Sequence, residues 1–146
     1  MFRHILAATD GSPFALEAVR HALGLAKSTG ARATIVTVTP TWRSLELSEI
    51  VVGRIEEQFA ARMSELAESS FAPVREVAAG LGIACETIHV TGDNPYESII
   101  ATAAARGCDL IVVGSHGRRG IERVLLGSET TKLLTHCKVP VLVYRR

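Results

Sequence analysis

The sequence lacks an excess of charge of either sign, because 16 Lys and Arg residues are balanced by 15 Asp and Glu residues. This balance gives no reason to expect nucleic acid or an anionic membrane as a partner. No apolar run approaches the roughly 18–20 residues that a membrane-spanning helix needs. Asp10 closely follows the first apolar run, so the N-terminus is not typical of a signal peptide. These absences predict a cytoplasmic protein with neither a membrane nor a nucleic-acid partner.

Cysteine is also scarce: Cys85, Cys108 and Cys137 are far apart, and no pair has the spacing of a zinc site. Each borders or lies in an apolar run, which favours buried, reduced thiols over a redox role. The chain has no linker, internal repeat or low-complexity segment. With 146 residues, 47% of them apolar, it is expected to form a single domain over residues 1–146 with a sizeable core.

Short apolar runs alternate with longer segments of helical periodicity, a pattern typical of a parallel sheet with crossover helices. The expected strands are residues 4–9, 34–39, 84–90, 110–113 and 139–144. This alternation predicts a three-layer α/β/α fold, in which one doubly wound parallel sheet of five strands is covered by helices.

Four helical segments connect these strands. The first is expected to begin after Ser12, an N-cap residue followed by proline, and to end at Gly30. The second is expected over residues 48–80, with Pro73 kinking or splitting it. Asn94 begins a sequence that resembles a capping box for the third helix. The inner face of the second helix is predicted to consist of Val52, Ile55, Phe59, Met63 and Leu66.

The most polar and glycine-rich strand ends are those of the first and fourth strands. Asp10 follows the first strand, and the fourth runs into a loop over residues 114–127, before a helix expected over 128–135. In doubly wound sheets, ligands bind beyond the carboxyl ends of strands, where the strand order reverses. Loop N–H groups beside a helix N-terminus favour phosphate. A carboxylate at Asp10 could accept hydrogen bonds from ribose or hold a metal ion beside phosphates.

Three common motifs are absent from this region. The dinucleotide motif G-x-G-x-x-G does not follow the first strand, and no Lys precedes Ser128 as a P-loop would require. The acidic pair that a response regulator carries after its first strand is also missing. The phosphate site therefore needs another explanation.

The loop carries a more specific pattern: Gly114 and Gly117, then nine residues, then Gly127 and Ser128. With the turn over residues 9–12 and the segments 112–117 and 139–143, this pattern makes the whole chain similar to the universal stress protein family, in its ATP-binding branch. The resemblance implies an adenine nucleotide alpha hydrolase-like fold, with strands in the spatial order 3-2-1-4-5. It also implies ATP as ligand, with magnesium, and a homodimer.

The resemblance further implies a role for each site residue. Asp10 would contact ribose or phosphate, Val38 would meet adenine, and Val113 with Gly114 would line the nucleoside. Phosphates would be cradled by Gly117, Gly127 and Ser128, with His116 beside them. Glu129 is a departure, because ATP-binding members often carry an apolar residue there. Its carboxylate would repel phosphates unless it points away or shares a cation.

Simpler roles remain open for the same residues. The glycines could be turn formers, Asp10 could cap the first helix, and Ser128 is expected to cap its helix in either case. His116 could be a loop residue that contacts ligand or solvent. Glu129 could favour the positive end of a helix dipole. The loop arginines could pair with phosphate or only with solvent: Arg118, Arg119 and Arg123.

Three functions are compatible with these residues. The first is an ATP-binding stress-response regulator that is linked to its nucleotide. The second is slow ATP hydrolysis or autophosphorylation, for which no P-loop Lys and no obvious catalytic base are present. The third is a dimeric interaction protein without nucleotide. Efficient enzymatic turnover is not expected.

The last strand, from Val139 to Tyr144, is expected at an edge of the sheet, because Pro140 lacks an N–H group. An exposed apolar edge promotes aggregation unless it is covered. Pairing of this edge with its copy about a two-fold axis would cover both edges and form a homodimer. The alternative is a monomer whose edge is shielded by its own helices and by Arg145 and Arg146.

Overall fold

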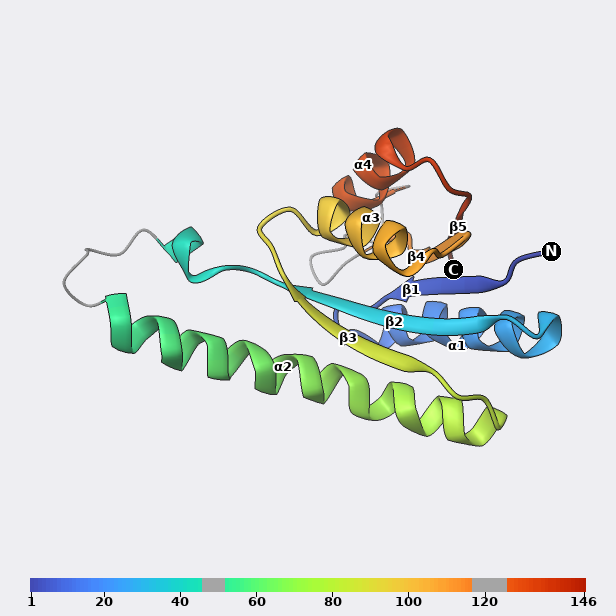
Figure 1. Cartoon of the computed structure of the whole chain (residues 1–146), viewed down its shortest axis with the longest axis horizontal. Helices are drawn as coiled ribbons and strands as arrows, with labels where there is room; N and C mark the ends of the chain where they lie inside the picture. The colour runs from blue at the N-terminus through green and yellow to red at the C-terminus, as the bar shows by residue number, and fades with distance from the viewer. Residues whose placement is uncertain (46–51, 117–125) are drawn as a thin grey trace.

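The computed structural model describes residues 1–45, 52–116 and 126–146. Its five-stranded parallel sheet has the order β3-β2-β1-β4-β5, which confirms the predicted topology. The strands are β1 (His4–Ala8), β2 (Arg32–Thr39), β3 (Glu86–Thr91), β4 (Leu110–Gly114) and β5 (Val141–Tyr144). The helices are α1 (Pro13–Thr29), α2 (Val52–Leu81), α3 (Pro95–Arg106) and α4 (Ser128–His136), with a 3₁₀ turn, η1 (Trp42–Leu45). The order reverses between β1 and β4, so their carboxyl ends are neighbours (Figure 1).

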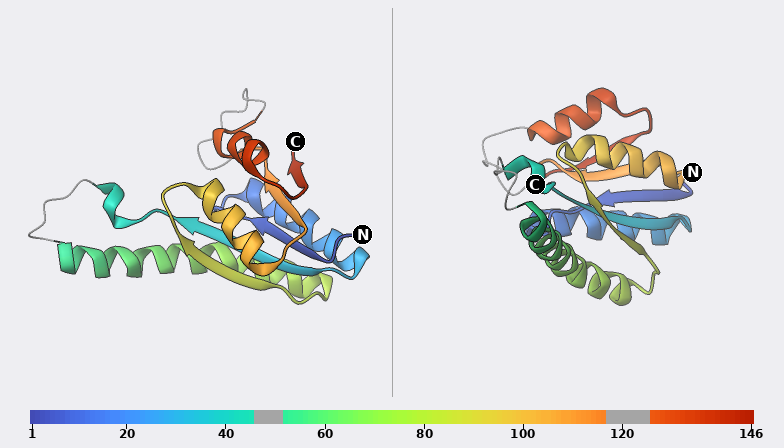
Figure 2. Two further views of the ribbon diagram at one scale, coloured as in Figure 1. Left: turned by 45° about the horizontal axis from the view of Figure 1, so that its top comes forward. Right: turned by 60° about the vertical axis from the view of Figure 1, so that its left-hand side comes forward.

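The sheet is the middle of three layers, with α1 and α2 on one face and α3 and α4 on the other (Figure 2). Alternate residues of β1 face opposite layers: Ile5 and Ala7 pack toward α1 and α2, whereas Leu6 packs toward α3 and α4. None of the three is more than 1% exposed. The central strand is therefore apolar on both faces, as parallel sheets require.

The strand boundaries differ from the expected ones by up to two residues. β2 begins at Arg32, because Arg32 already pairs with His4 of β1. β3 covers Glu86–Thr91 rather than 84–90. β5 begins at Val141 rather than Val139, since Pro140 has no N–H to donate and contributes only its carbonyl, which accepts from Ile111 (3.0 Å). β5 lies beside β4 at the edge of the sheet, as predicted.

Pro73 does not split the second helix, which runs unbroken as α2 from Val52 to Leu81. The buried Phe71 and Val74, next to Pro73, hold this part of the helix against the core. The carbonyl that loses its donor belongs to Ser69, an exposed residue whose carbonyl water can reach. Packing thus outweighs the cost of the proline.

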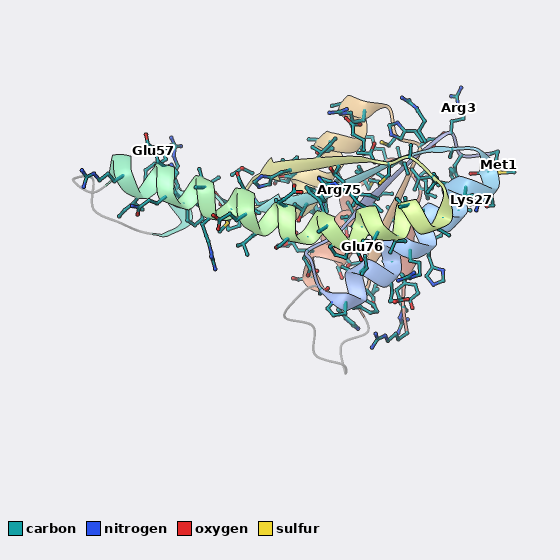
Figure 3. The ribbon with its side chains drawn as sticks, turned by 90° about the horizontal axis from the view of Figure 1, so that it is seen from below. Met1, Arg3, Lys27, Glu57, Arg75 and Glu76 are labelled. Atoms are coloured by element: carbon teal, nitrogen blue, oxygen red, sulfur yellow. The ribbon has the colours of Figure 1, made fainter. Side chains whose placement is uncertain are left out.

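The predicted inner face of α2 lies on the expected side of the helix, but it is less buried than expected. Ile55, Phe59, Met63 and Leu66 are only half-buried, and the side chain of Val52 lies outside the described residues. The first half of α2 projects past the sheet, with Glu57 on the projecting part and Arg75 on the part that covers the sheet (Figures 1 and 3). The buried face belongs to the second half: Ala67, Ser70, Phe71, Val74, Val77 and Ala78.

The helix caps confirm one expectation and contradict another. The Ser12 side chain accepts a hydrogen bond from the Ala15 N–H (3.1 Å) and caps α1, which ends at Gly30 in a left-handed conformation. Asn94 has the backbone conformation of a cap before α3, but its side chain makes no capping hydrogen bond. Another residue therefore has to satisfy the N-terminus of α3.

The three cysteines are free thiols, with Cys108 buried and Cys85 and Cys137 half-buried. Burial raises the pKa of Cys108 to about 11, so this thiol stays protonated and is a poor nucleophile. The expectation of reduced thiols is consistent with this environment. Within the described ranges, no helix has the length and apolar character to cross a membrane.

Candidate functional site

A cavity of about 200 Å³ lies where the carboxyl ends of β1, β2 and β4 meet the first turns of α3 and α4. Six of the predicted site residues line it: Asp10, Val38, Val113, Gly114, His116 and Glu129. Gly127 and Ser128 lie beside it, at the start of α4, and Gly117 lies outside the described residues. The fold therefore brings together residues that are up to 119 positions apart in the sequence.

One wall of the cavity is apolar. Val36 and Val38 alternate along β2 and point to the same side of the sheet, toward α3 and α4. Ile99 of α3 and Leu133 of α4 complete this wall. An apolar wall with a few polar groups at one end is the usual form of a site for a flat base attached to a polar group.

Asp10 shapes the turn that opens this end of the sheet. Its Oδ1 accepts a hydrogen bond from the Ser12 N–H (2.9 Å), and Thr9 Oγ1 accepts one from the Gly11 N–H (3.2 Å). Asp10 therefore does not itself cap α1, because the capping oxygen is that of Ser12. It also lines the cavity, so it combines a structural role with access to a ligand.

Gly114 and Gly127 are needed for close packing and are not turn formers. Neither has a positive φ, since Gly114 is in β4 and Gly127 has φ of −67°. A Cβ on Gly114 would lie 2.8 Å from the Phe14 ring, and one on Gly127 would lie 3.1 Å from the Ser115 carbonyl oxygen. The Gly127 N–H donates to that same oxygen (2.6 Å), which brings the start of α4 against the end of β4.

The N-terminus of α4 is capped differently from the expectation. Gly127 is the N-cap residue and Ser128 is the first helical residue, so the Ser128 hydroxyl does not cap the helix. Thr130 Oγ1 donates to the Gly114 carbonyl (3.1 Å) and ties the helix to β4. No side chain within the described ranges caps this helix end. Its N–H groups can therefore serve an anion.

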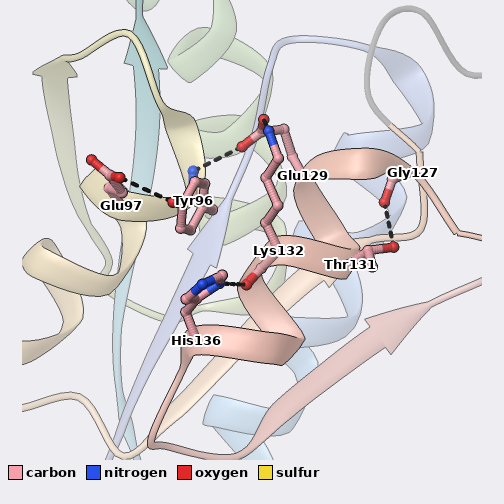
Figure 4. A network of polar contacts seen from close by, with 7 residues as sticks. All are labelled: Tyr96, Glu97, Gly127, Glu129, Thr131, Lys132 and His136. Carbon is pink, nitrogen blue, oxygen red and sulfur yellow. Dashed lines mark hydrogen bonds and ion pairs between the residues drawn. The ribbon is translucent and has the colours of Figure 1, made fainter.

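Glu129 connects the first turns of two helices (Figure 4). Its Oε2 accepts a hydrogen bond from the backbone N–H of Tyr96 (3.0 Å), in the first turn of α3. The carboxylate thus supplies the cap that the Asn94 side chain does not. Lys132 Nζ lies 3.5 Å from Glu129 Oε1 and 5.7 Å from the centre of the Tyr96 ring.

Tyr96 itself was not expected at the site. Its hydroxyl donates to Glu97 Oε1 (3.0 Å), and this hydrogen bond raises the pKa of Tyr96. The sequence held no signal for the contact between Tyr96 and Glu129, because it depends on how α3 packs against α4. The carboxylate of Glu129 nevertheless lines the cavity, as the motif position suggested.

Two polar atoms beside the cavity have no hydrogen-bond partner in the described part of the chain. They are Ser115 Oγ and His116 Nδ1, and both are inaccessible to solvent. Buried polar groups nearly always have a hydrogen-bond partner in folded proteins, so two such atoms without one call for an explanation. The His116 ring lies 5.6 Å from that of Phe14 and lines the cavity. Ser115, which the sequence reasoning did not select, lies within the matched segment 112–117.

The lining residues include two carboxylates, Asp10 and Glu129, and no Lys or Arg within the described ranges. No group of three potential metal ligands occurs in that part of the chain. Two carboxylates beside a phosphate would suit Mg²⁺, which is commonly held by one or two carboxylates together with substrate phosphates. The donor set therefore fits a magnesium ion that arrives with a nucleotide, and it does not form a metal cage of its own.

Sequence comparison identifies the class of protein that has this fold and site. The profile of the universal stress protein family matches residues 1–145. The universal stress protein YxiE of Bacillus subtilis is 31% identical over 153 aligned residues, which cover 99% of this chain and 100% of YxiE. The chain belongs to the universal stress protein family.

Solved structures agree with this assignment. Protein MJ0577 of Methanocaldococcus jannaschii is similar with a TM-score of 0.85 and 27% identity, covering 100% of this chain and 97% of its own. A universal stress protein in complex with cAMP has a TM-score of 0.69 and 24% identity, covering 99% of this chain and 97% of its own. At that identity the second likeness establishes the shared fold.

Proposed function

We propose that this chain is a cytoplasmic ATP-binding universal stress protein that acts as a nucleotide-linked regulator of a stress response. The observation that carries the proposal is the cavity at the switch point of the sheet, with its apolar wall beside the uncapped start of α4. These two features suit an adenine base and a phosphate chain. The cAMP complex of a protein with this fold supports an adenine nucleotide as the class of ligand.

In this proposal the base packs against Val38, and the nucleoside against Val113 and Gly114. Asp10 accepts hydrogen bonds from the ribose hydroxyls. The absence of a side chain on Gly114 keeps room for the Phe14 ring, which lies 2.8 Å from where a Cβ would be. These contacts would fix the nucleoside part of the ligand.

The phosphates are directed to the start of α4 at Gly127 and Ser128, where the α4 dipole favours negative charge and the N–H of Ser128 is the first that could donate, since that of Gly127 already donates to Ser115. His116, which lines the cavity, would lie beside them. A phosphate contact at Gly117 is proposed on the motif alone. Asp10 and Glu129 would be the residues that hold a magnesium ion, whose charge would offset that of the phosphates.

Calorimetric titration of the full chain with ATP, with and without magnesium, tests the proposal. Saturable binding of one ATP per chain is expected. Val38→Phe should remove most of the affinity, because the larger side chain occupies the apolar wall. Val90→Phe is the matched control, since Val90 pairs with Val38 in the sheet but does not line the cavity. Equal affinity in both variants would contradict this position of the base.

The two other functions give different results in the same assay. Release of inorganic phosphate would identify slow hydrolysis, and a radiolabelled protein band after incubation with γ-labelled ATP would identify autophosphorylation. Absence of any nucleotide binding would leave an interaction protein without nucleotide. His116, which lines the cavity, is the residue to substitute first if phosphate is released.

We also propose a homodimer through the edge strand β5. The carbonyls of Pro140 and Tyr144 accept hydrogen bonds from Ile111 in β4 and from Ser115 directly after it. The backbone groups of Val141 and Val143 therefore point to the open edge. Leu142 is 39% exposed and adds apolar surface. Sedimentation at micromolar concentration should show a dimer, and Val143→Pro should weaken it by removing an outward N–H. A folded Val143→Pro variant that still dimerises fully would contradict this interface.

A further inference from the structure

We propose that Glu129 determines which charge state of nucleotide the site accepts: it disfavours free ATP relative to AMP and makes ATP binding depend on magnesium. This role of Glu129 rests on the proposed nucleotide function, and it specifies which adenine nucleotides the site binds best. It concerns a residue at which this chain departs from the pattern expected of ATP-binding relatives.

The first step is the position of the carboxylate. Glu129 follows Ser128 directly and belongs to the first turn of α4, the helix end that favours phosphate. It also lines the cavity. A phosphate chain that reaches the start of α4 would therefore lie beside a negative side chain.

A hydrogen bond to the first turn of α3 holds the Glu129 carboxylate in this position. Its Oε2 accepts from the Tyr96 N–H at 3.0 Å, and no side chain of Asn94 replaces it as a cap for α3. Turning Glu129 out to solvent would leave the N–H of Tyr96, which is half-buried, without its acceptor. The hydrogen bond to Tyr96 therefore opposes rotation of the Glu129 carboxylate away from a bound phosphate.

The charged groups around Glu129 leave its negative charge only partly compensated. Among the described residues, Asp10 is a second carboxylate on the lining, and Lys132 Nζ lies 3.5 Å from Glu129 Oε1. The side chains of Lys132 and Glu129 are 49% and 42% exposed, so water partly screens both their attraction and the repulsion between Glu129 and a phosphate. Each added phosphate increases the repulsion, whereas a magnesium ion bound to the phosphates reverses its sign. Adenosine has no phosphate, so its affinity would not depend on the charge of Glu129.

Glu129→Gln tests the inference with little change in shape, because the amide oxygen can still accept from the Tyr96 N–H. Calorimetry would measure the affinities of adenosine, AMP, ATP with EDTA, and ATP with excess magnesium. The expected gain for free ATP is roughly three- to tenfold, with a smaller gain for AMP and less than about twofold for adenosine. With magnesium the gain should vanish or become a loss.

Glu97→Gln is the matched control. It removes a carboxylate that also contacts Tyr96, in the first turn of α3, at a residue that does not line the cavity. Lys132→Gln should act in the opposite direction and weaken free ATP most. Because Lys132 lies on the surface, this second variant keeps the inference testable if Glu129→Gln unfolds, which the thermal midpoint would reveal.

The outcomes separate the inference from the proposed function. If all four ligands bind and Glu129→Gln changes each affinity equally, the role of Glu129 is overturned and the nucleotide site remains. The same holds if Glu97→Gln changes the affinities as much as Glu129→Gln does. Failure of adenosine, AMP and ATP to bind any variant would overturn the nucleotide function, and the role of Glu129 with it. A selective gain for free ATP supports both.

Discussion

The two ends of the sheet differ in how their buried polar atoms are satisfied. At the amino end, the ring of His4 contacts Thr34 Oγ1 (2.8 Å) and the Arg106 carbonyl (3.1 Å), and Asp109 accepts from the His4 N–H (2.9 Å). At the carboxyl end, Ser115 Oγ and His116 Nδ1 have no partner within the described residues. Unpaired buried groups reduce stability, so Ser115 Oγ and His116 Nδ1 call for a partner that the described residues do not supply. This difference is what we expect if the amino end mainly stabilises the fold and the carboxyl end binds the proposed nucleotide.

The largest expected effect is at the amino end. His4 is only 4% exposed, so His4→Ala removes a buried ring and leaves Thr34 Oγ1 without its close partner. The free energy of unfolding should fall by about 2–4 kcal/mol. Chemical denaturation measures this loss, and nucleotide affinity below the unfolding transition should be unchanged. His136→Ala, at an exposed position, is the control and should cost less than about 1 kcal/mol.

A smaller loss is expected from Gly114→Ala at the carboxyl end. The new Cβ would lie 2.8 Å from the Phe14 ring, which would have to move, at a cost of about 1–3 kcal/mol. Because Gly114 lines the cavity, this change should also weaken nucleotide binding. Gly24→Ala is the matched control: it places a Cβ in open space within α1 and should stabilise the protein by up to about 1 kcal/mol. Equal effects of the two changes would contradict the packing role of Gly114.

These contrasts also show how far the sequence could predict the structure. The alternation of apolar strands and helices predicts a doubly wound parallel sheet, because local periodicity and chain connectivity determine that class of fold. The order of its strands, and with it the position of Asp10 beside the loop that begins at Gly114, followed only from the resemblance to the family. The projection of the first half of α2 was not predictable, since its apolar spacing is the same whether or not a sheet lies under it. The contact of Glu129 with Tyr96 depends on the packing of two separate helices.

Acid stability should also distinguish the two ends. The N–H groups of His4 and Arg3 hold the pKa of Asp109 below its ordinary value of 3.8. Asp109 therefore contributes its full stabilisation above that value, and loses it as the pH falls through the lower pKa of the folded state. In Asp109→Asn the decline in thermal midpoint below about pH 4 should be shallower than in the wild type. Glu57→Gln, on the projecting part of α2, is the charge-matched control, and an equal flattening there would contradict the assignment to Asp109.

The smallest effect is expected from Ser115→Ala, and it gives the most direct test of the difference between the two ends. Ser115 and Thr34 are each 1% exposed, but only the Thr34 hydroxyl has a close partner among the described residues. Thr34→Val leaves His4 Nε2 unpaired and should cost about 1–3 kcal/mol, whereas Ser115→Ala removes an unpaired hydroxyl and should change stability by less than about 1 kcal/mol, or increase it. Parallel denaturation of both variants without nucleotide makes the comparison. If Ser115→Ala costs as much as Thr34→Val, the hydroxyl of Ser115 has a partner in solution, and the carboxyl end is as fully satisfied as the amino end.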